Sequence, residues 1–246
     1  MAEPRLLERF LDERRAAARI ACDSTLVPAP GQYVMAHDPA SDDPLAVPVF
    51  SAGDSPDGFF AASPLPRAWT PGVQLSLRGP LGRGFALPIH ARRVALAALD
   101  AAPAYLLGLL PRALAQGAAV ALVCDDPPEE LPAEVEIRPL EALEEVAQWA
   151  DYLALAVRRI AVGQGSHVGQ QGSHAGQQGS HAGLPLQVGA NLRVRPDPLR
   201  GPREAQALIV VPMPCGGLAK CGVCSVEVGK ENALACEEGP TFDWRF

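Results

Sequence analysis

The sequence predicts a protein of α/β plus β class: an N-terminal helix and an antiparallel β-barrel, then a short parallel α/β sheet and a small C-terminal cysteine-rich domain. Three observations predict this order. Strand candidates separated by turn clusters fill residues 28–88, apolar strands alternate with helical stretches from residue 92, and four cysteines gather near the C-terminus. With 246 residues and 48% apolar side chains, the chain is long enough to bury a sizeable core.

An amphipathic helix is expected at residues 4–20. Leu6, Leu7, Phe10 and Leu11 lie near helical spacing, and arginine and glutamate residues stand between them. A helix with this pattern buries one apolar stripe and leaves its charged face in water.

The next segment, residues 28–88, is rich in proline, glycine and valine, which suits short strands joined by tight turns. Regular spacing of such strands is typical of a small antiparallel barrel. The strand candidates are Tyr33–Ala36, Ala46–Ala52, Gly58–Ala62 and Val73–Arg78.

Beyond residue 92 the strand candidates are apolar without alternation, and each lies next to a helical stretch. Strands that are buried on both faces have this composition, so we expect a short parallel sheet of three or four strands, covered by helices. The strand candidates are residues 94–99, 119–125, 135–140 and 151–157, and the helix candidates are residues 103–117 and 140–150.

A repeat of glycine, glutamine, serine and histidine interrupts the chain at residues 163–183. Because such a segment cannot bury enough apolar area to offset its ordering entropy, we expect a flexible insertion. Its histidines, His167, His174 and His181, recur every seven residues, and a solvated repeat is favoured over a metal-binding tract. These changes in composition divide the chain into residues 1–90, 91–162, 163–204 and 205–246, the last of which begins with a strand at Ala205–Val211.

Charge and composition exclude several classes of function. The net charge of −7 argues against nucleic acid or an anionic membrane surface as the main partner. No stretch approaches the roughly 20 apolar residues of a membrane-spanning helix, and the charged N-terminus does not resemble a signal peptide, so a cytoplasmic protein is expected. No group of residues suggests hydrolytic chemistry, and no catalytic side chain is assigned. Cys22 and Cys124 stand alone and are expected to be buried thiols.

The most informative residues are Cys215, Cys221, Cys224 and Cys236. Clustered cysteines in an intracellular chain, with glycines between them, point to metal ligation rather than disulfides. Zinc ribbons usually carry two CxxC pairs, whereas this loop has one. Its C-x5-C-x2-C-x11-C spacing is one residue longer at the start than the C-x4-C-x2-C of plant-type [2Fe–2S] loops. The spacing favours an iron–sulfur cluster and leaves zinc, or a loop without metal, as the alternative.

The residues around the cysteines carry a more specific likeness. The segments VVPMPCGGLAKCGVCSVEV and LACEEGPTFDW resemble the cluster domain of the electron transfer subunits of dihydroorotate dehydrogenase, within the ferredoxin–NADP reductase superfamily. The resemblance implies a [2Fe–2S] cluster on the four cysteines, a flavoenzyme catalytic subunit as partner in a hetero-oligomer, and a place in pyrimidine biosynthesis. Besides the cysteines, the matching positions are Met213, Gly216, Gly239, Pro240, Phe242 and Asp243.

That family places a flavin-binding barrel first and a nicotinamide-binding domain second, which is the order that the sequence predicts here. Two segments, residues 30–39 and 71–88, are similar to the family's flavin-domain strands. Pro48, however, stands where relatives carry an arginine that meets the flavin phosphates, and proline offers neither charge nor donor. FAD stays a candidate cofactor, and its candidate contacts are Ser51, Gly79 and Gly82.

The expected nicotinamide site lacks its glycines. Relatives have a glycine-rich turn after the first α/β strand, where missing side chains let a pyrophosphate approach the backbone. Here residues 98–102 read Ala-Leu-Asp-Ala-Ala, with alanines and Asp100 in place of the glycines, and a carboxylate beside a pyrophosphate is unfavourable. Binding of NAD(P) is therefore disfavoured.

Three functions are compatible with these features. The first is an electron-transfer iron–sulfur subunit that relays electrons between a flavin or nicotinamide system and a partner oxidoreductase. The second is a complete NAD(P)H-oxidising reductase that carries FAD and the cluster. The third is a non-redox structural or regulatory subunit with zinc in the cysteine loop.

Overall fold

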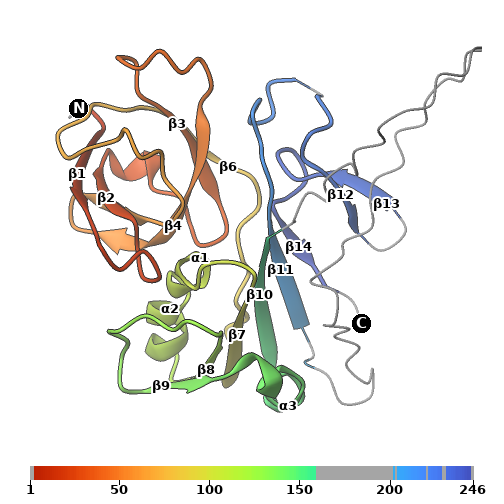
Figure 1. The fold of residues 1–246 in the computed structure, drawn as a ribbon. Helices are drawn as coiled ribbons and strands as arrows, with labels where there is room; N and C mark the ends of the chain where they lie inside the picture. The colour runs from red at the N-terminus through yellow and green to blue at the C-terminus, as the bar shows by residue number, and fades with distance from the viewer. Residues whose placement is uncertain (1–2, 159–201, 203, 220, 229–230, 245–246) are drawn as a thin grey trace, which may run out of the picture.

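The computed structural model describes residues 3–158, 202, 204–219, 221–228 and 231–244. The predicted repeat at residues 163–183 and most of the linker that follows it lie outside this part of the chain. Figure 1 shows a curled antiparallel sheet, a parallel sheet next to it and a small hairpin beyond the parallel sheet.

The N-terminal sheet has the strand order β1-β2-β5-β4-β3-β6, and all neighbouring strands are antiparallel. Its two ends meet, because the Leu6 amide donates to the Val73 carbonyl and the Gly72 amide donates to the Leu6 carbonyl. The sheet therefore forms the predicted small barrel. The strands are β1 (Arg5–Arg9), β2 (Ala18–Ala21), β3 (Tyr33–His37), β4 (Val47–Ser55), β5 (Gly58–Ala61) and β6 (Ser76–Leu81), with a 3-10 turn, η1 (Ser24–Leu26), between β2 and β3.

The predicted N-terminal helix is wrong. Residues 5–9 and 18–21 pair instead as antiparallel strands, with Leu6 opposite Ile20. Both side chains are fully buried in the barrel core with Phe59, whereas Leu11, which the helix would place on its apolar face, is fully exposed. A single helix is only marginally stable in water, and burial in the barrel outweighs its local preference.

The second sheet has the order β14-β11-β10-β7-β8-β9. Strands β11, β10, β7, β8 and β9 run parallel, and β14 pairs antiparallel with β11. The sheet has more strands than the three or four expected, because the segment after residue 204 adds two of them. The strands are β7 (Arg93–Leu99), β8 (Ala119–Val123), β9 (Val135–Arg138), β10 (Tyr152–Arg158), β11 (Glu204–Val210) and β14 (Thr241–Asp243).

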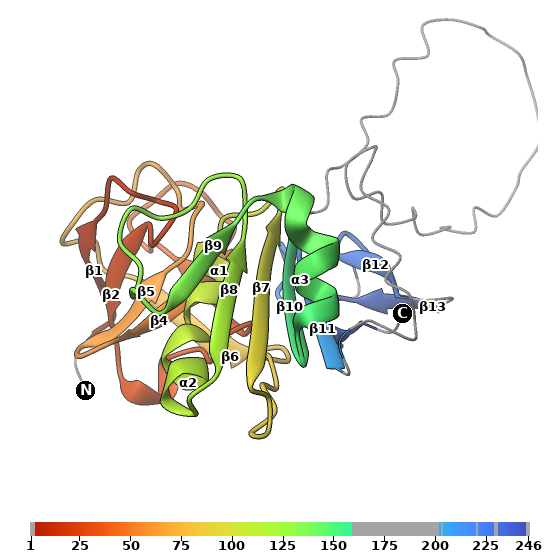
Figure 2. The ribbon, with the colours of Figure 1, turned by 90° about the horizontal axis from the view of Figure 1, so that it is seen from below.

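Helices cover both faces of this sheet, as expected (Figure 2). The helix expected at residues 103–117 is divided into α1 (Ala104–Leu107) and α2 (Leu110–Ala115), since Gly108 ends the first and Pro111 starts the second. Both pack on the face that also meets the barrel, while η2 (Leu140–Ala142) and α3 (Leu143–Trp149) lie on the opposite face. No helix in the described ranges has the length and apolar character needed to cross a membrane.

The C-terminal segment is interwoven with the rest of the molecule. After β11 the chain forms the cysteine loop, the hairpin β12 (Ser225–Val228) and β13 (Glu231–Leu234), and a turn that leads to β14. Strand β14 brings it back to the edge of the parallel sheet, where the Gln206 side chain donates to Asp243. Residues on both sides of position 205 therefore share one sheet.

Leu6 is buried and Leu11 is exposed in the β1–β2 hairpin, so their replacement should affect stability differently. Leu6→Ala should lower the free energy of unfolding by about 2–5 kcal/mol, because it leaves a cavity in the barrel core. Leu11→Ala should change it by less than about 0.5 kcal/mol, since its side chain is in water. Urea unfolding followed by circular dichroism measures both. Equal destabilisation by the two variants would support the predicted helix instead of the hairpin.

Candidate functional site

The four predicted cysteines lie in one region and contact each other as two pairs. The Sγ atoms of Cys215 and Cys221 are 3.5 Å apart, and those of Cys224 and Cys236 are 3.1 Å apart. Cys224 and Cys236 are buried, whereas Cys221 is exposed and Cys215 partly so. The loop thus has one buried pair of thiols and one pair close to the surface.

The cysteine loop rests on the barrel. From β6, the Arg78 guanidinium donates to the Gly216 carbonyl at 2.6 Å. Gly216 itself has φ of 50°, and a Cβ at this position would lie 2.5 Å from Met35 Cγ on β3. A side chain would therefore collide with the barrel, which explains the glycine beside Cys215 by close approach as well as by its backbone conformation.

Tyr33 supports the buried pair from the barrel side. Its side chain is fully buried, and its hydroxyl donates to the Cys236 carbonyl at 3.2 Å. Burial, followed by the proximity of Cys236, raises the pKa of Tyr33 to about 12, so the phenol stays neutral and keeps its proton for this hydrogen bond.

The two pairs differ in their protonation. Hydrogen bonds between the sulfur of Cys215 and the loop backbone, led by that of Ala219, lower the pKa of Cys215 to about 7. Burial, followed by the hydrogen bond with Cys224, raises the pKa of Cys236 to about 12. A bound metal ion would lower the raised pKa of Cys236, because the charge of the metal stabilises the thiolate. The loop backbone already favours the thiolate form at Cys215.

The distances between the paired sulfur atoms can be compared with those in metal sites. Two thiolates bound at about 2.3 Å to one tetrahedral ion lie roughly 3.8 Å apart, which is longer than the separations of 3.5 Å and 3.1 Å within the two pairs. Among the described residues, no group of three or more metal-ligating side chains has the geometry of a metal site. Four thiols in two pairs are a suitable donor set for a group of two metal ions, each with two cysteines, and also for a single tetrahedral ion.

The residues that follow Cys236 fix the loop to both sheets. Arg83 donates its amide to the Gly239 carbonyl, and the Ile209 amide donates to the Pro240 carbonyl. A Cβ on Gly239 would lie 2.5 Å from the Phe242 ring, so the glycine is required by this contact. The Gly-Pro-x-Phe-Asp pattern therefore has a structural role: it joins the barrel, the parallel sheet and the cysteine loop.

The candidate FAD contacts have structural explanations of their own. Ser51 is buried on β4, and its hydroxyl accepts from the Gly53 amide at a bulge. A Cβ on Gly79 would lie 2.9 Å from Val34 Cγ1, and one on Gly82 would lie 2.5 Å from Pro240 Cδ. Their roles as flavin contacts stay a prediction, since close approach alone accounts for both glycines.

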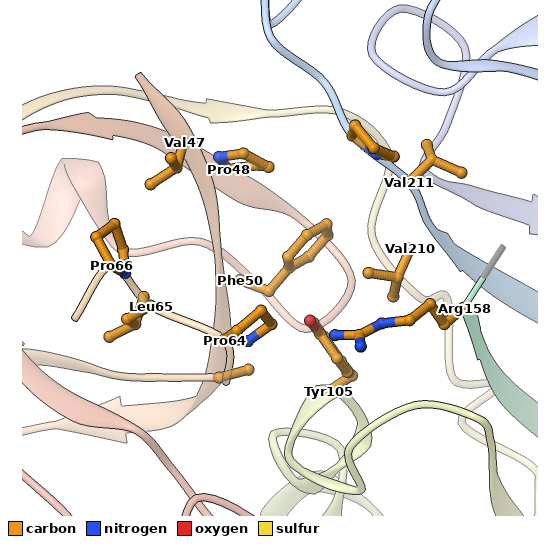
Figure 3. A pocket seen from close by; sticks show the side chains of 12 residues that line it. Val47, Pro48, Phe50, Pro64, Leu65, Pro66, Tyr105, Arg158, Val210 and Val211 are labelled. Atoms are coloured by element: carbon orange, nitrogen blue, oxygen red, sulfur yellow. The ribbon is translucent and has the colours of Figure 1, made fainter. Parts of the chain in front are cut away.

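A cavity of about 550 Å³ lies between the barrel and the parallel sheet (Figure 3). Strand β4 contributes Val47, Pro48 and Phe50, and β10 contributes Arg158 from the opposite side. Pro48 thus lines the cavity at the position where an arginine was expected. The other lining residues are Ala62, Pro64, Leu65, Pro66, Tyr105, Val210, Val211 and Pro212.

Aromatic rings connect this cavity to the cysteine loop. Phe50 meets Tyr105 edge-on at 5.3 Å between ring centroids, and it meets Tyr33 at 5.7 Å. Tyr33 in turn bonds to the Cys236 backbone. The wall of the cavity and the buried cysteine pair are therefore joined through two adjacent rings, Phe50 and Tyr33.

The turn after β7 has a left-handed backbone conformation of the kind that glycine usually adopts, but the residue there is Asp100. Asp100 has φ of 50° and is the one non-glycine with positive φ among the described residues. Helix α1, which starts after Pro103, has only four residues. The backbone conformation survives, but the side chain of Asp100 brings an acidic group to the place where a pyrophosphate would approach the backbone.

The comparisons with known proteins concern the fold. No family model matches the chain, and no curated protein matches its sequence significantly. One solved structure, an NADH-dependent reduced ferredoxin-NADP oxidoreductase described in connection with flavin-based electron bifurcation, has a TM-score of 0.64. It is 13% identical and covers 99% of this chain and 88% of its own.

Two further solved structures are less similar. The ferredoxin reductase of carbazole 1,9a-dioxygenase, in an FAD apo form, has a TM-score of 0.48, 16% identity and coverage of 63% of this chain and 58% of its own. An Amycolatopsis cytochrome P450 reductase has a TM-score of 0.39, 17% identity and coverage of 63% and 51%. From the first structure, the chain has a ferredoxin reductase-like fold, as the sequence predicted for its barrel and α/β parts.

Sequence reasoning missed Tyr33, Arg78, Tyr105 and Arg158, which shape the site. No motif marks any of them, and their partners lie far away in the sequence. One indirect signal was present in the sequence: Pro48 stands where relatives carry an arginine, so any positive charge at this place has to come from another part of the chain.

Gly82 gives a test of the contact between the barrel and the C-terminal segment. Gly82→Ala should lower the free energy of unfolding by about 1–3 kcal/mol more than Gly117→Ala. Both residues have nearly the same φ, 74° and 72°, but only Gly82 has a neighbour in the way. Thermal or urea unfolding measures the difference. Equal losses would mean that backbone strain, rather than the Pro240 contact, explains the glycine.

Proposed function

We propose that this chain is an electron-transfer subunit that carries a [2Fe–2S] cluster. Cys215 and Cys221 would hold one iron, and Cys224 and Cys236 the other. The observation that carries the proposal is the pairing of the four thiols, at 3.5 Å and 3.1 Å. A bound cluster of this kind accepts and releases one electron at a time.

The residues around the thiols are suited to such a role. Tyr33 and Arg78 bond to the backbone of the loop and hold it against the barrel. The buried pair lies on the Tyr33 side, and the exposed Cys221 marks the side that a partner protein could reach. Leu218 and Val223, which flank Cys221, are exposed apolar residues that would be covered by such a partner.

The partner, by resemblance, is a flavoenzyme catalytic subunit of the dihydroorotate dehydrogenase type, in a cytoplasmic hetero-oligomer. The support is the pattern of Met213, the cysteines and the Gly-Pro-x-Phe-Asp ending, to which the fold adds a reductase scaffold. Co-expression with such a subunit encoded next to this chain should give a complex on gel filtration, and Leu218→Asp should weaken it. A chain that stays alone when that subunit is present would contradict this assignment of the partner.

Metal content tests the cluster directly. The chain purified without oxygen should contain about two irons and two labile sulfides, with the visible spectrum of an oxidised [2Fe–2S] centre and, after addition of dithionite, the electron paramagnetic resonance signal of the reduced one. Cys224→Ser should abolish most of the loading because it leaves one iron with a single thiolate. Cys124→Ser, a buried cysteine outside the loop, is the matched control and should load fully. Zinc without iron in the wild type would favour the structural role instead.

Reduction by nicotinamides separates the electron-transfer subunit from a complete reductase. On mixing with NADH or NADPH, the iron-loaded chain should keep its oxidised spectrum, since Asp100 opposes a pyrophosphate at the turn after β7. Dithionite should reduce the same sample, which shows that the centre is competent. Rapid bleaching by either nicotinamide would establish the complete reductase.

A further inference from the structure

Three side chains of the barrel support the cysteine loop. Tyr33 and Met35 lie two residues apart on β3 and therefore on the same face of the strand, and Arg78 on β6 pairs with Met35 across the sheet. Gly216 of the loop lies against two of them, since a Cβ there would be 2.5 Å from Met35 Cγ and 2.6 Å from Arg78 Nη2. Of these three side chains, Arg78 is the one that carries a charge.

The guanidinium of Arg78 bonds to the loop backbone rather than to a carboxylate. Its Nη2 atom donates to the Gly216 carbonyl at 2.6 Å and lies 3.5 Å from the Cys215 carbonyl oxygen. It forms no ion pair with any carboxylate in the part of the chain that the structure describes. The side chain is partly buried, and arginine stays protonated in proteins. A positive charge without an acidic partner therefore lies beside the first cysteine of the loop.

Holding the loop does not by itself require this charge. Tyr33 makes the equivalent contact at the buried pair, where its neutral hydroxyl donates to the Cys236 carbonyl at 3.2 Å. A guanidinium that is partly withdrawn from water loses hydration, and a neutral donor would avoid that loss. The charge of Arg78 therefore needs an explanation beyond its hydrogen bond.

The four thiols account for a charge of this sign. Four thiolates around two irons and two sulfides leave the bound group negative, and reduction adds one more electron to it. A fixed positive charge nearby stabilises the reduced form more than the oxidised form, because the attraction grows with the negative charge that it faces. The charge of Arg78 also acts at the buried pair, since it opposes the rise in the pKa of Tyr33 that burial and the proximity of Cys236 cause.

We propose that Arg78 is a positioning residue with a second role: its charge raises the reduction potential of the cluster that the cysteine loop binds. This inference rests on the electron-transfer function proposed above. Through the Gly216 carbonyl the guanidinium holds the backbone beside Cys215, and through its charge it makes the loaded chain a better electron acceptor. A residue that only held the backbone would affect iron loading or stability and leave the potential where it was.

A redox titration followed by electron paramagnetic resonance tests this role on the full chain, purified without oxygen. Because the signal comes only from loaded and reduced protein, the midpoint potential does not depend on the fraction of chains that carry iron. Arg78→Met and Arg78→Gln both remove the charge, and the second keeps an N–H donor for the Gly216 carbonyl. Each should lower the equilibrium constant for reduction on the order of tenfold, or about 59 mV for a one-electron couple.

Three further variants separate the charge from its position and from the hydrogen bond. Arg78→Lys keeps the charge and should stay within about twofold of the wild type in the same equilibrium constant. Arg112→Met removes the same charge from an exposed position on α2 and should leave the potential unchanged. Tyr33→Phe removes the neutral donor to the Cys236 carbonyl, so it should lower loading or stability and shift the potential less than Arg78→Met does.

The role of Arg78 would be overturned by any of three results: a wild-type potential in the uncharged variants that load iron, an equal loss in Arg78→Lys, or the same shift in Arg112→Met. In each of these outcomes a normal iron and sulfide content would leave the proposed function of the cysteine loop standing. A wild-type chain without iron would overturn both.

Discussion

The antiparallel addition of β14 to β11 is the interaction on which the arrangement of the site depends. Within a few residues this segment bonds to the parallel sheet through the Pro240 carbonyl and to the barrel through the Gly239 carbonyl. It begins at Cys236, whose own carbonyl is bonded to Tyr33. The two sheets and the buried thiols therefore share one short stretch of backbone, and the geometry of the loop follows from it.

A second connection between barrel and α/β sheet is electrostatic and weaker. Arg14 on the β1–β2 hairpin forms ion pairs of 3.0 Å with Asp126 and Glu129, and Arg15 pairs with Glu130 at 2.8 Å. All three acidic partners are well exposed, so each pair contributes little to stability and is screened by salt. Apolar burial around Phe50 and Tyr105, together with the β14 contact, holds the two parts together.

Local pattern predicted those parts of the fold in which each strand or helix has a clear signal of its own. Strands β3, β5, β7 and β10 follow their predicted ranges closely, because turn clusters or apolar runs mark them. The N-terminal helix failed since Leu6 finds its partner, Ile20, across a hairpin that no periodicity reveals. The thiols were predictable from spacing, whereas Arg78 and Tyr33 act on residues 138 and 203 positions away.

Local sequence was enough to predict that a barrel precedes an α/β sheet and a cysteine loop, together with the set of four thiols and the uncharged residue at Pro48, because these depend on side-chain chemistry and short-range spacing. Only the tertiary structure decided that the thiols face each other two by two, and that a guanidinium from β10 lies across the cavity from Pro48. The physical reason is that distances between residues far apart in the chain are set by how sheets pack and close, and this cooperative burial leaves no local trace in the sequence.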